Sequence, residues 1–553
     1  MTIRSTLLVS ALAMFAANTA FAAPPVRVPF TKGSGNEAVI EPPVAHPDET
    51  PCVVKLYKNA QFGANNVNFL YQPPANCPGP YSTIVLSVDV SLDAGIQYDR
   101  SGTIWIGGVP LWFGTTAEPT PSLGPSWHFE RDVTDYTSLL GGTNPGFVLI
   151  ANYTNSQDNS IITSSAKLLF YPVPSGQTPP VVPDVIIPLA ADGGGTVALN
   201  TGTDTVAIDQ ELPTNIASAN LDVFLQGQSG DEFWYTCVPD DLASELNSCG
   251  GGAYREGEIT VDGSPAGVAP VYPWIFTGGI DPYLWAPIPG VQTLNFKPFR
   301  VPLTPFAGVL SNGTIAHQIA LSVYGANSYF SVAGALMLYL DHGGSQVTGS
   351  ITQNTLAAPS SKLKNTITTK NGTTSGKLNT TAKRNFVISG SVVTSAGTEQ
   401  YTVQQNGSFA NDQKFDISNS EYEQDIYQLT DTTVQTELEA PGGNTTQVSK
   451  YTYPLTVDYK QGGGPQAISI SQDFRQQVTT SSAGATTTST LDDNIKTGTG
   501  GTLAARKGGK FPANVSSEAH YTTTDSATGT CFKRTLKAAG NVLTSAKTTT
   551  SCK

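Results

Sequence analysis

Charge is scarce in this sequence. Asp, Glu, Lys and Arg make up 13% of its residues, against about 25% in an average soluble domain. The 30 Lys and Arg residues are outnumbered by 43 Asp and Glu residues, so the formal net charge is −13. Nucleic acid is bound through clustered basic side chains, and this balance argues against it as a partner. Neutral polar residues solvate most of the surface and lose no charge in acid, so we expect acid tolerance.

Residues that carry metal, nucleotide or nucleophilic chemistry are also few. The five histidines are scattered, and the sequence has no H-E-x-x-H motif, no Cys/His zinc spacing, no G-x-S-x-G elbow and no P-loop. We therefore expect no metal and no cofactor. The six cysteines form three local pairs, although other pairings remain open, and full pairing would leave no thiol nucleophile. The pairs are Cys52–Cys77, Cys237–Cys249 and Cys531–Cys552.

Long apolar runs are confined to the N-terminus. Arg4 supplies a positive charge, Leu7 to Phe15 are largely apolar, and Ala20-Phe21-Ala22 has the small-residue pattern of a cleavage site. This combination predicts a secretory signal peptide at residues 1–22. No later stretch approaches the roughly 18 apolar residues of a membrane span. We expect a secreted or periplasmic monomer that does not engage a membrane.

Helical periodicity is almost absent, whereas strand alternation recurs along the chain. Leu86, Val88, Val90 and Leu92 alternate with polar residues, and the run at 221–225 repeats the pattern. Similar elements follow both runs in the same order, which indicates an internal duplication. We predict an all-β protein with two side-by-side jelly-roll-like β-sandwiches and a third β-rich domain. The expected domains are 24–178, 179–345 and a Thr- and Ser-rich C-terminal domain at 346–553.

The duplication places two acids at equivalent positions. Asp99 and Glu232 each lie seven residues beyond the last apolar residue of their strand. Ligand sites often form where domains meet, so this pair is the first candidate for a shared site. Asp and Glu are also common at strand ends, where they simply cap loops.

Tryptophan is absent after residue 285. All six tryptophans lie between residues 105 and 285. Trp105 alternates within T-I-W-I and is expected in a core, whereas Trp234, Trp274 and Trp285 lie in loop-like sequence. Flat aromatic faces next to carboxylates, as in S-G-D-E-F-W-Y-T-C at 229–237, suit the apolar face and hydroxyl groups of a sugar ring. Carbohydrate is the expected class of ligand.

Several motifs resemble one known family. Among them are Y-D-R-S-G-T-I-W-I-G-G-V-P, T-T-A-E-P-T, F-E-R-D-V-T-D-Y, D-E-F-W-Y, G-A-Y-R-E, Y-P-W-I-F-T-G-G-I-D-P-Y-L-W and V-P-L-T-P-F. Together they resemble the peptide-N-glycosidase A family of acid-active asparagine amidases, from about residue 50 to 345. The more distant peptide-N-glycosidase F enzymes are similar in the first motifs and have two adjacent jelly rolls.

The resemblance implies hydrolysis of the amide between an asparagine side chain and N-acetylglucosamine. The substrates would be N-glycopeptides or N-glycoproteins, the asparagine would become aspartate, and the optimum would be acidic. The residues that the resemblance matches to catalytic ones are Asp99, Glu232 and Glu130. Candidate substrate-binding residues are Tyr98, Arg100, Asp231, Trp234, Arg255, Trp274 and Trp285.

Two other functions fit the same residues. A glycosidase could use the two acids at an anomeric carbon, and would leave N-acetylglucosamine on the asparagine. A lectin or adhesin could use the acids and aromatic residues to bind sugar without reaction. Only the family resemblance separates these possibilities at the level of sequence.

Overall fold

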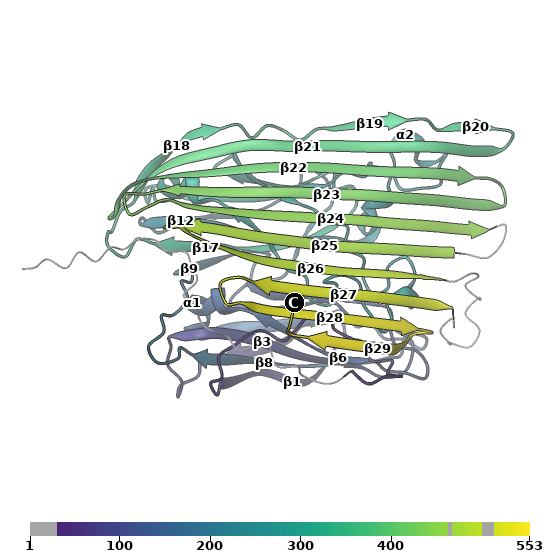
Figure 1. Ribbon diagram of the computed structural model, residues 1–553, viewed down its shortest axis with the longest axis horizontal. Helices are drawn as coiled ribbons and strands as arrows, with labels where there is room; N and C mark the ends of the chain where they lie inside the picture. Colours follow the sequence, from purple (N-terminus) through teal and green to yellow (C-terminus); the bar gives the residue numbers. More distant parts are fainter. Residues whose placement is uncertain (1–29, 463–466, 500–513, 553) are drawn as a thin grey trace, which may run out of the picture.

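The computed structural model describes residues 30–462, 467–499 and 514–552, and Figure 1 shows their course. The expected signal peptide at 1–22 lies outside these residues. Strands dominate the chain, and its three described α-helices have four residues each. The prediction of an all-β protein is confirmed. Within the described ranges, no helix is long and apolar enough to cross a membrane.

Two four-stranded antiparallel sheets form the first β-sandwich. Its core includes Leu86, Val88 and Val90, on one face of strand β3, as the alternation predicts. The first sheet contains, in spatial order, β1 (Cys52–Gln61), β8 (Ile162–Pro172), β3 (Tyr81–Leu92) and β6 (Ser126–Asp132). The second contains β2 (Val67–Tyr71), β7 (Asn144–Ile150), β4 (Ser101–Ile106) and β5 (Val109–Thr115).

The second β-sandwich repeats this arrangement. One sheet contains β10 (Val197–Leu199), β17 (Phe330–Leu340), β12 (Ile216–Gly227) and β15 (Phe299–Pro302), with β9 (Val185–Leu189) also paired to β17. The other contains β11 (Thr205–Gln210), β16 (His317–Tyr324), β13 (Glu256–Val261) and β14 (Ser264–Pro270). The central strands β3 and β12 occupy corresponding places, so the loops that follow them leave corresponding edges.

Turn chemistry also repeats between the sandwiches. Gly107 and Gly108 join β4 to β5 with φ values of 56° and 79°, and Asp262 and Gly263 join β13 to β14 with φ values of 50° and 75°. Positive φ at both central residues is the requirement of a type I′ turn, which matches the twist of a two-residue hairpin. A short 3₁₀ segment and a one-turn helix follow β6 and β15 alike: η1 (Thr134–Tyr136) with α1 (Thr137–Leu140), and η5 (Thr304–Phe306) with α3 (Ala307–Leu310).

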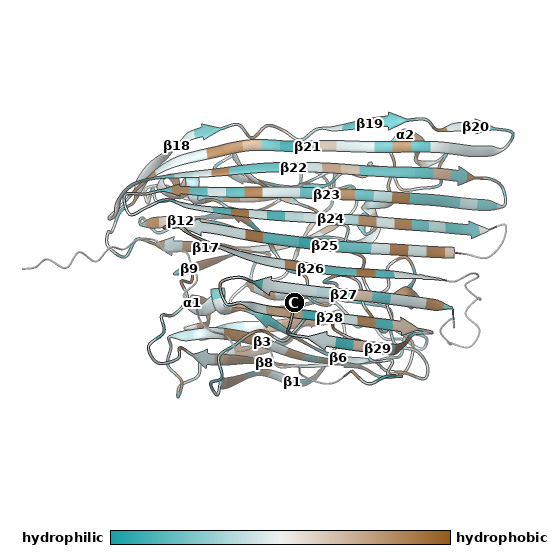
Figure 2. Cartoon of the chain, viewed as in Figure 1, coloured by the Kyte–Doolittle hydropathy of each residue, from teal (hydrophilic) through white to brown (hydrophobic). Residues whose placement is uncertain are grey.

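The C-terminal region forms one large twelve-stranded antiparallel sheet. Its strands reach 22 residues, and hydrophobic and hydrophilic residues alternate along them (Figure 2). The buried face packs on the second sandwich in one continuous core, which holds Phe409, Tyr453 and Phe474 of the sheet. The strands are β18 (Thr348–Asn354), β19 (Ser361–Asn365), β20 (Thr368–Lys370), β21 (Thr373–Thr394), β22 (Gly397–Ile417), β23 (Glu421–Glu439), β24 (Thr445–Gly462), β25 (Ala467–Ser482), β26 (Ala485–Thr499), β27 (Val515–Asp525), β28 (Thr530–Ala539) and β29 (Val542–Thr549).

Three disulfides link the chain in the expected pairs. Cys52 joins Cys77, Cys237 joins Cys249 and Cys531 joins Cys552. The first lies in the first sandwich and the second closes the loop that follows Glu232. The third ties β28 to the C-terminal end of the large sheet.

Candidate active site

The two acids at equivalent strand ends meet at the seam between the sandwiches. Asp99 lies in the loop between β3 and β4, and Glu232 caps the 3₁₀ segment η2 (Ser229–Asp231) that follows β12. Each carboxyl is close enough to the other for the charge of Asp99 to raise the pKa of Glu232. Ser101 and Gln228 bridge the same seam with a hydrogen bond between Oγ and Oε1 of 3.5 Å. The duplication therefore delivers one acid from each sandwich to a common site.

A third carboxyl, Glu118, joins this pair. It follows β5 within the T-T-A-E-P-T motif. A Cβ added to Gly278 would overlap the carboxyl groups of both Asp99 and Glu118, so both lie against the backbone of this glycine. The Gly278 N–H also donates a hydrogen bond to Asp99. Glu118 and Gly278 were not singled out in the sequence, although the motifs that contain them were.

The two acids at equivalent positions of the duplication have different electrostatic surroundings. Burial and the negative charge of Asp99 raise the pKa of Glu232 to about 7. Burial also raises the pKa of Asp99, while the Gly278 N–H and the Arg100 guanidinium oppose that rise. Because these two groups favour the charged form of Asp99, it is the better candidate for a carboxylate and Glu232 for a protonated acid.

Exposed aromatic rings lie beside Asp99 on the first sandwich. Tyr98 and Tyr153 are 53% and 57% exposed. The Arg100 guanidinium lies 5.8 Å and 5.9 Å from the centroids of their rings. Gln97 accepts a hydrogen bond from Arg100 Nη2 at 2.6 Å and donates to Asn152 Oδ1 at 2.6 Å, which holds the cluster in place. Two aromatic faces and a cation are thus presented to solvent next to the acids.

Comparison with known proteins identifies the family. Residues 42–357, more than half of the chain, match the family described as peptide N-acetyl-beta-D-glucosaminyl asparaginase amidase A. The chain belongs to this amidase A family. It is 28% identical over 337 residues to the peptide-N4-(N-acetyl-beta-glucosaminyl)asparagine amidase A of Prunus dulcis. The match covers 56% of this chain and 58% of that relative, so it spans little more than half of the relative's length.

Two solved structures show a weak similarity to this chain. PNGF-II has a TM-score of 0.36 and 14% identity, with 53% of this chain and 66% of that chain covered. PNGase F, described as a glycosylasparaginase from Flavobacterium meningosepticum, has a TM-score of 0.34 and 13% identity, with 53% and 96% covered.

Three tryptophans expected to face sugar are buried. Trp234, Trp274 and Trp285 are 2%, 9% and 1% exposed. Trp234 packs near Phe409, and Trp274 near Tyr453, because the large sheet covers the loops that carry them. The expectation that these indole rings face a sugar is therefore wrong. Trp105, which is 1% exposed, lies in a core as predicted.

Trp285 nevertheless supports the site from behind. Its Nε1 donates a hydrogen bond of 2.8 Å to the carbonyl of Gly279. Gly279 follows the glycine that contacts Asp99 and Glu118. The indole thus holds the turn against which both carboxyl groups rest.

Asp231 and Arg255 also have a structural role rather than the expected sugar contact. Asp231 Oδ1 lies 3.0 Å from Arg255 Nη2, and both side chains are at most 1% exposed. The other carboxylate oxygen accepts the backbone N–H groups of Asn327, Ser328 and Tyr329 at 2.7–3.0 Å. This buried charge pair holds the Glu232 loop to the loop between β16 and β17, and its burial keeps it from contact with a ligand.

Glu130 lies on the wrong face of its strand for the catalytic role expected of it. Its neighbours Trp127 and Phe129 point into the first core, so Glu130 and His128 point to the opposite face of the sheet. Glu130 Oε2 accepts the backbone N–H of Val44 at 3.0 Å, and Oε1 lies 3.5 Å from His128 Nε2. This acid anchors the N-terminal segment, and Glu118 takes its place beside Asp99.

The large sheet holds the loop that carries Glu232 through a row of buried amides. Asn411 Nδ2 donates to the carbonyl of Tyr235 at 2.9 Å, Gln424 Nε2 to that of Thr236 at 3.1 Å, and Gln413 Nε2 to that of Cys237 at 3.0 Å. We call these three side chains, Asn411, Gln413 and Gln424, the amide ladder. Gln413 also donates a hydrogen bond to Asn411, and Gln424 donates one to Gln413. The C-terminal sheet thereby fixes a loop of the second sandwich whose own sequence gives no sign of this partner.

Proposed function

We propose that this member of the amidase A family hydrolyses the amide that joins an asparagine side chain to N-acetylglucosamine in N-glycopeptides or N-glycoproteins. The observation that carries the proposal is that Asp99 and Glu118 meet against the backbone turn at Gly278, with Glu232 close enough to Asp99 to feel its charge. Membership of the family and the name of the Prunus dulcis relative support the same reaction.

The residues of the site can supply both proton transfers of the reaction. Asp99, as a carboxylate, accepts a proton from water while the water oxygen bonds to the amide carbon. Glu232, in its protonated form, donates a proton to the leaving nitrogen as the carbon–nitrogen bond breaks. The products are a peptide with aspartate in place of asparagine and a glycosylamine, which loses ammonia in water. Tyr98, Tyr153 and Arg100 provide the wall for the first sugar, a role that we first expected of the tryptophans.

The pH dependence follows from the two acids. Asp99 must be ionised, so activity falls in strong acid as that carboxylate is protonated. Glu232 must be protonated, and its pKa of about 7 means that activity also falls as the pH rises through neutrality. We therefore propose an optimum on the acidic side of pH 7.

We also propose that the protein acts outside the cytoplasm. The signal-peptide pattern at residues 1–22 supports export. The three disulfides support an oxidising compartment, since such bonds persist there.

Mass spectrometry of one defined N-glycopeptide incubated with the purified protein tests the reaction. The expected product is a sugar-free peptide with Asp at the former Asn, formed by the wild type and not by Asp99→Asn. A peptide that keeps N-acetylglucosamine would make the protein a glycosidase. An unchanged glycopeptide that still binds would place it among lectins.

A further inference from the structure

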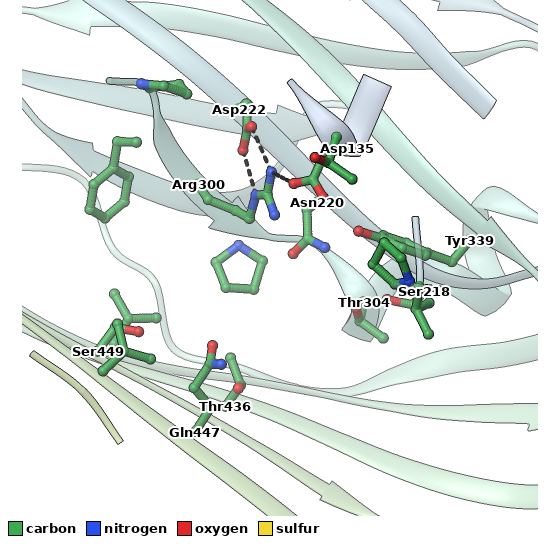
Figure 3. A pocket seen from close by; sticks show the side chains of 18 of the residues that line it. Asp135, Ser218, Asn220, Asp222, Arg300, Thr304, Tyr339, Thr436, Gln447 and Ser449 are labelled. Carbon is green, nitrogen blue, oxygen red and sulfur yellow. Dashed lines mark hydrogen bonds and ion pairs between the residues drawn. The ribbon is translucent and has the colours of Figure 1, made fainter. Parts of the chain in front are cut away.

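A large cavity lies between the second sandwich and the large sheet. Its volume is about 1380 Å³, above the 300–1,000 Å³ range of ordinary small-molecule pockets. Edge strand β15 and the start of β12 form one wall, and strands β23 and β24 form the opposite one. Figure 3 shows Asn220 and Arg300 on the first wall and Thr436, Gln447 and Ser449 on the other.

The acids of the amidase centre are not part of the cavity lining. The cavity runs along β12 from Ala217 to Gln226, whereas Glu232 follows the end of this strand at Gly227. Neither Asp99, Glu118 nor Glu232 lines the cavity. A ligand held here occupies a place of its own.

The charges in the cavity disfavour an anionic ligand. Arg300 Nε and Nη2 lie 2.7 Å and 2.8 Å from the carboxylate oxygens of Asp222, and Nη2 also lies 2.8 Å from Asp135 Oδ2. Two carboxylates thus more than balance one guanidinium, although Arg300 and Asp135 remain 40% and 39% exposed. The rest of the lining adds Lys297 and five more carboxyl groups, those of Asp132, Asp341, Glu399, Glu437 and Asp525. An anion would meet a cation already paired, and a cation would compete with Arg300 for both acids. The pairing instead holds polar groups rigidly at the cavity wall.

The remaining lining suits a neutral, hydroxyl-rich molecule. Asn220, Thr436, Gln447 and Ser449 offer amide and hydroxyl groups that both donate and accept hydrogen bonds. The half-buried ring of Tyr451 adds an apolar face between them. Buried aromatic rings stand behind it in the wall: Tyr272, Trp274, Phe299, Tyr339, Tyr401 and Phe474. A sugar ring presents hydroxyl groups at its edge and C–H groups on its faces, and matches this mixture.

We propose that this cavity is a second carbohydrate site that binds a neutral oligosaccharide of more than one sugar. Its size accommodates several rings, and its excess of carboxyl groups selects against acidic sugars. The site does not depend on the amidase reaction, because binding there uses none of the three acids. It gives the large sheet a ligand-facing role in addition to its support of the Glu232 loop.

Filling the cavity from one strand tests the proposal. Ser449 faces the cavity from β24, and Ser449→Trp places an indole inside it. The next residue, Lys450, is exposed and lies outside the cavity lining, so Lys450→Trp adds the same side chain to the same strand as a matched control. Asn220→Ala, on the opposite wall, removes an amide without adding bulk.

Calorimetric titration of the full-length protein with mannopentaose and chitotetraose provides the readout. We expect binding by the wild type and Lys450→Trp, and loss of at least about tenfold in affinity for Ser449→Trp and Asn220→Ala. Each variant should still cleave a glycopeptide that carries a single N-acetylglucosamine, which shows that the fold is intact. Should Ser449→Trp misfold, Asn220→Ala alone decides the question.

Two results would overturn the proposal that a second site exists. One is the absence of binding of either oligosaccharide to the wild type. The other is unchanged affinity in the two cavity variants, which would place all binding at the amidase centre. Affinity that falls steeply with added salt, or a preference for a sialylated oligosaccharide, would contradict a neutral ligand. Absence of amidase activity in the wild type would refute the proposed function. The binding test would still stand, with circular dichroism in place of cleavage as the control for folding.

Discussion

Asn411→Leu breaks the amide ladder at its most buried member. Asn411 is 1% exposed, and its side chain donates to the Tyr235 carbonyl and to Gln428 Oε1, both at 2.9 Å. Its Oδ1 accepts a hydrogen bond from Gln413 Nε2 at 2.9 Å. Leucine has a similar volume, so the change removes hydrogen bonds while it preserves packing.

Three buried groups lose a partner in this variant. Each unsatisfied buried group costs about 1–3 kcal/mol, and removal of the asparagine's own buried amide offsets part of the sum. We expect the free energy of unfolding to fall by about 2–4 kcal/mol, with the destabilisation concentrated on the segment 233–238. Because this segment directly follows Glu232, displacement of the acid by about 1 Å should lower kcat about 10- to 100-fold, with a smaller change in KM.

Steady-state kinetics on a glycopeptide, well below the thermal midpoint, measure this effect. The matched control is Asn406→Leu, which makes the same change on the exposed face of β22. The pH dependence of kcat tests whether Glu232 has moved. The pH near 7 at which activity falls should shift when the surroundings of Glu232 change. Equal kcat in the two variants, with unaltered pH profiles, would refute a positioning role for the amide ladder.

Four further predictions concern the carboxyl groups and their supports. Asp99→Asn should lower kcat at least about 10³-fold while circular dichroism and the thermal midpoint stay close to wild type. Gly278→Ala should abolish most activity, since the added methyl overlaps two carboxyl groups of the site; activity close to wild type would contradict the geometry. Arg255→Met leaves its carboxylate partner buried and unpaired, and should cost about 3–5 kcal/mol in a urea titration. Stability should also depend on pH: burial raises the pKa values of Glu232 and Glu256 from 4.5 to about 7, so the native state keeps protons that the unfolded state releases. The free energy of unfolding should therefore fall as the pH rises from about 4.5 to about 7, by about 1–3 kcal/mol for each group; thermal scans at the two pH values measure this, and a higher midpoint at neutral pH would contradict it.

Local pattern was enough to establish the β architecture. The alternation at 86–92 and 221–225 is a property of consecutive residues, and each run forms the central strand of a sandwich. The repeated order of elements predicted that Asp99 and Glu232 leave corresponding edges, and the structure brings the two acids together. The turns at Gly107-Gly108 and Asp262-Gly263 follow in the same way from local backbone preference.

The surroundings of those acids were decided by packing between distant segments. Trp234, Trp274 and Trp285 resemble exposed loop residues in the sequence, but strands more than a hundred residues later cover them. Glu118 and Gly278 belong to different sandwiches, and only docking of the two places them side by side.

The same distinction applies to the large sheet. Its sequence by itself determined long alternating strands, because the period of two is local. It did not determine which loops the buried Asn and Gln side chains would hold, since a hydrogen bond between Asn411 and Tyr235 depends on how two whole domains pack. The strands and the first two acids were thus determined by the sequence alone. The tertiary structure decided the third carboxyl, the aromatic wall and the second cavity, because these depend on contacts between segments far apart in the chain.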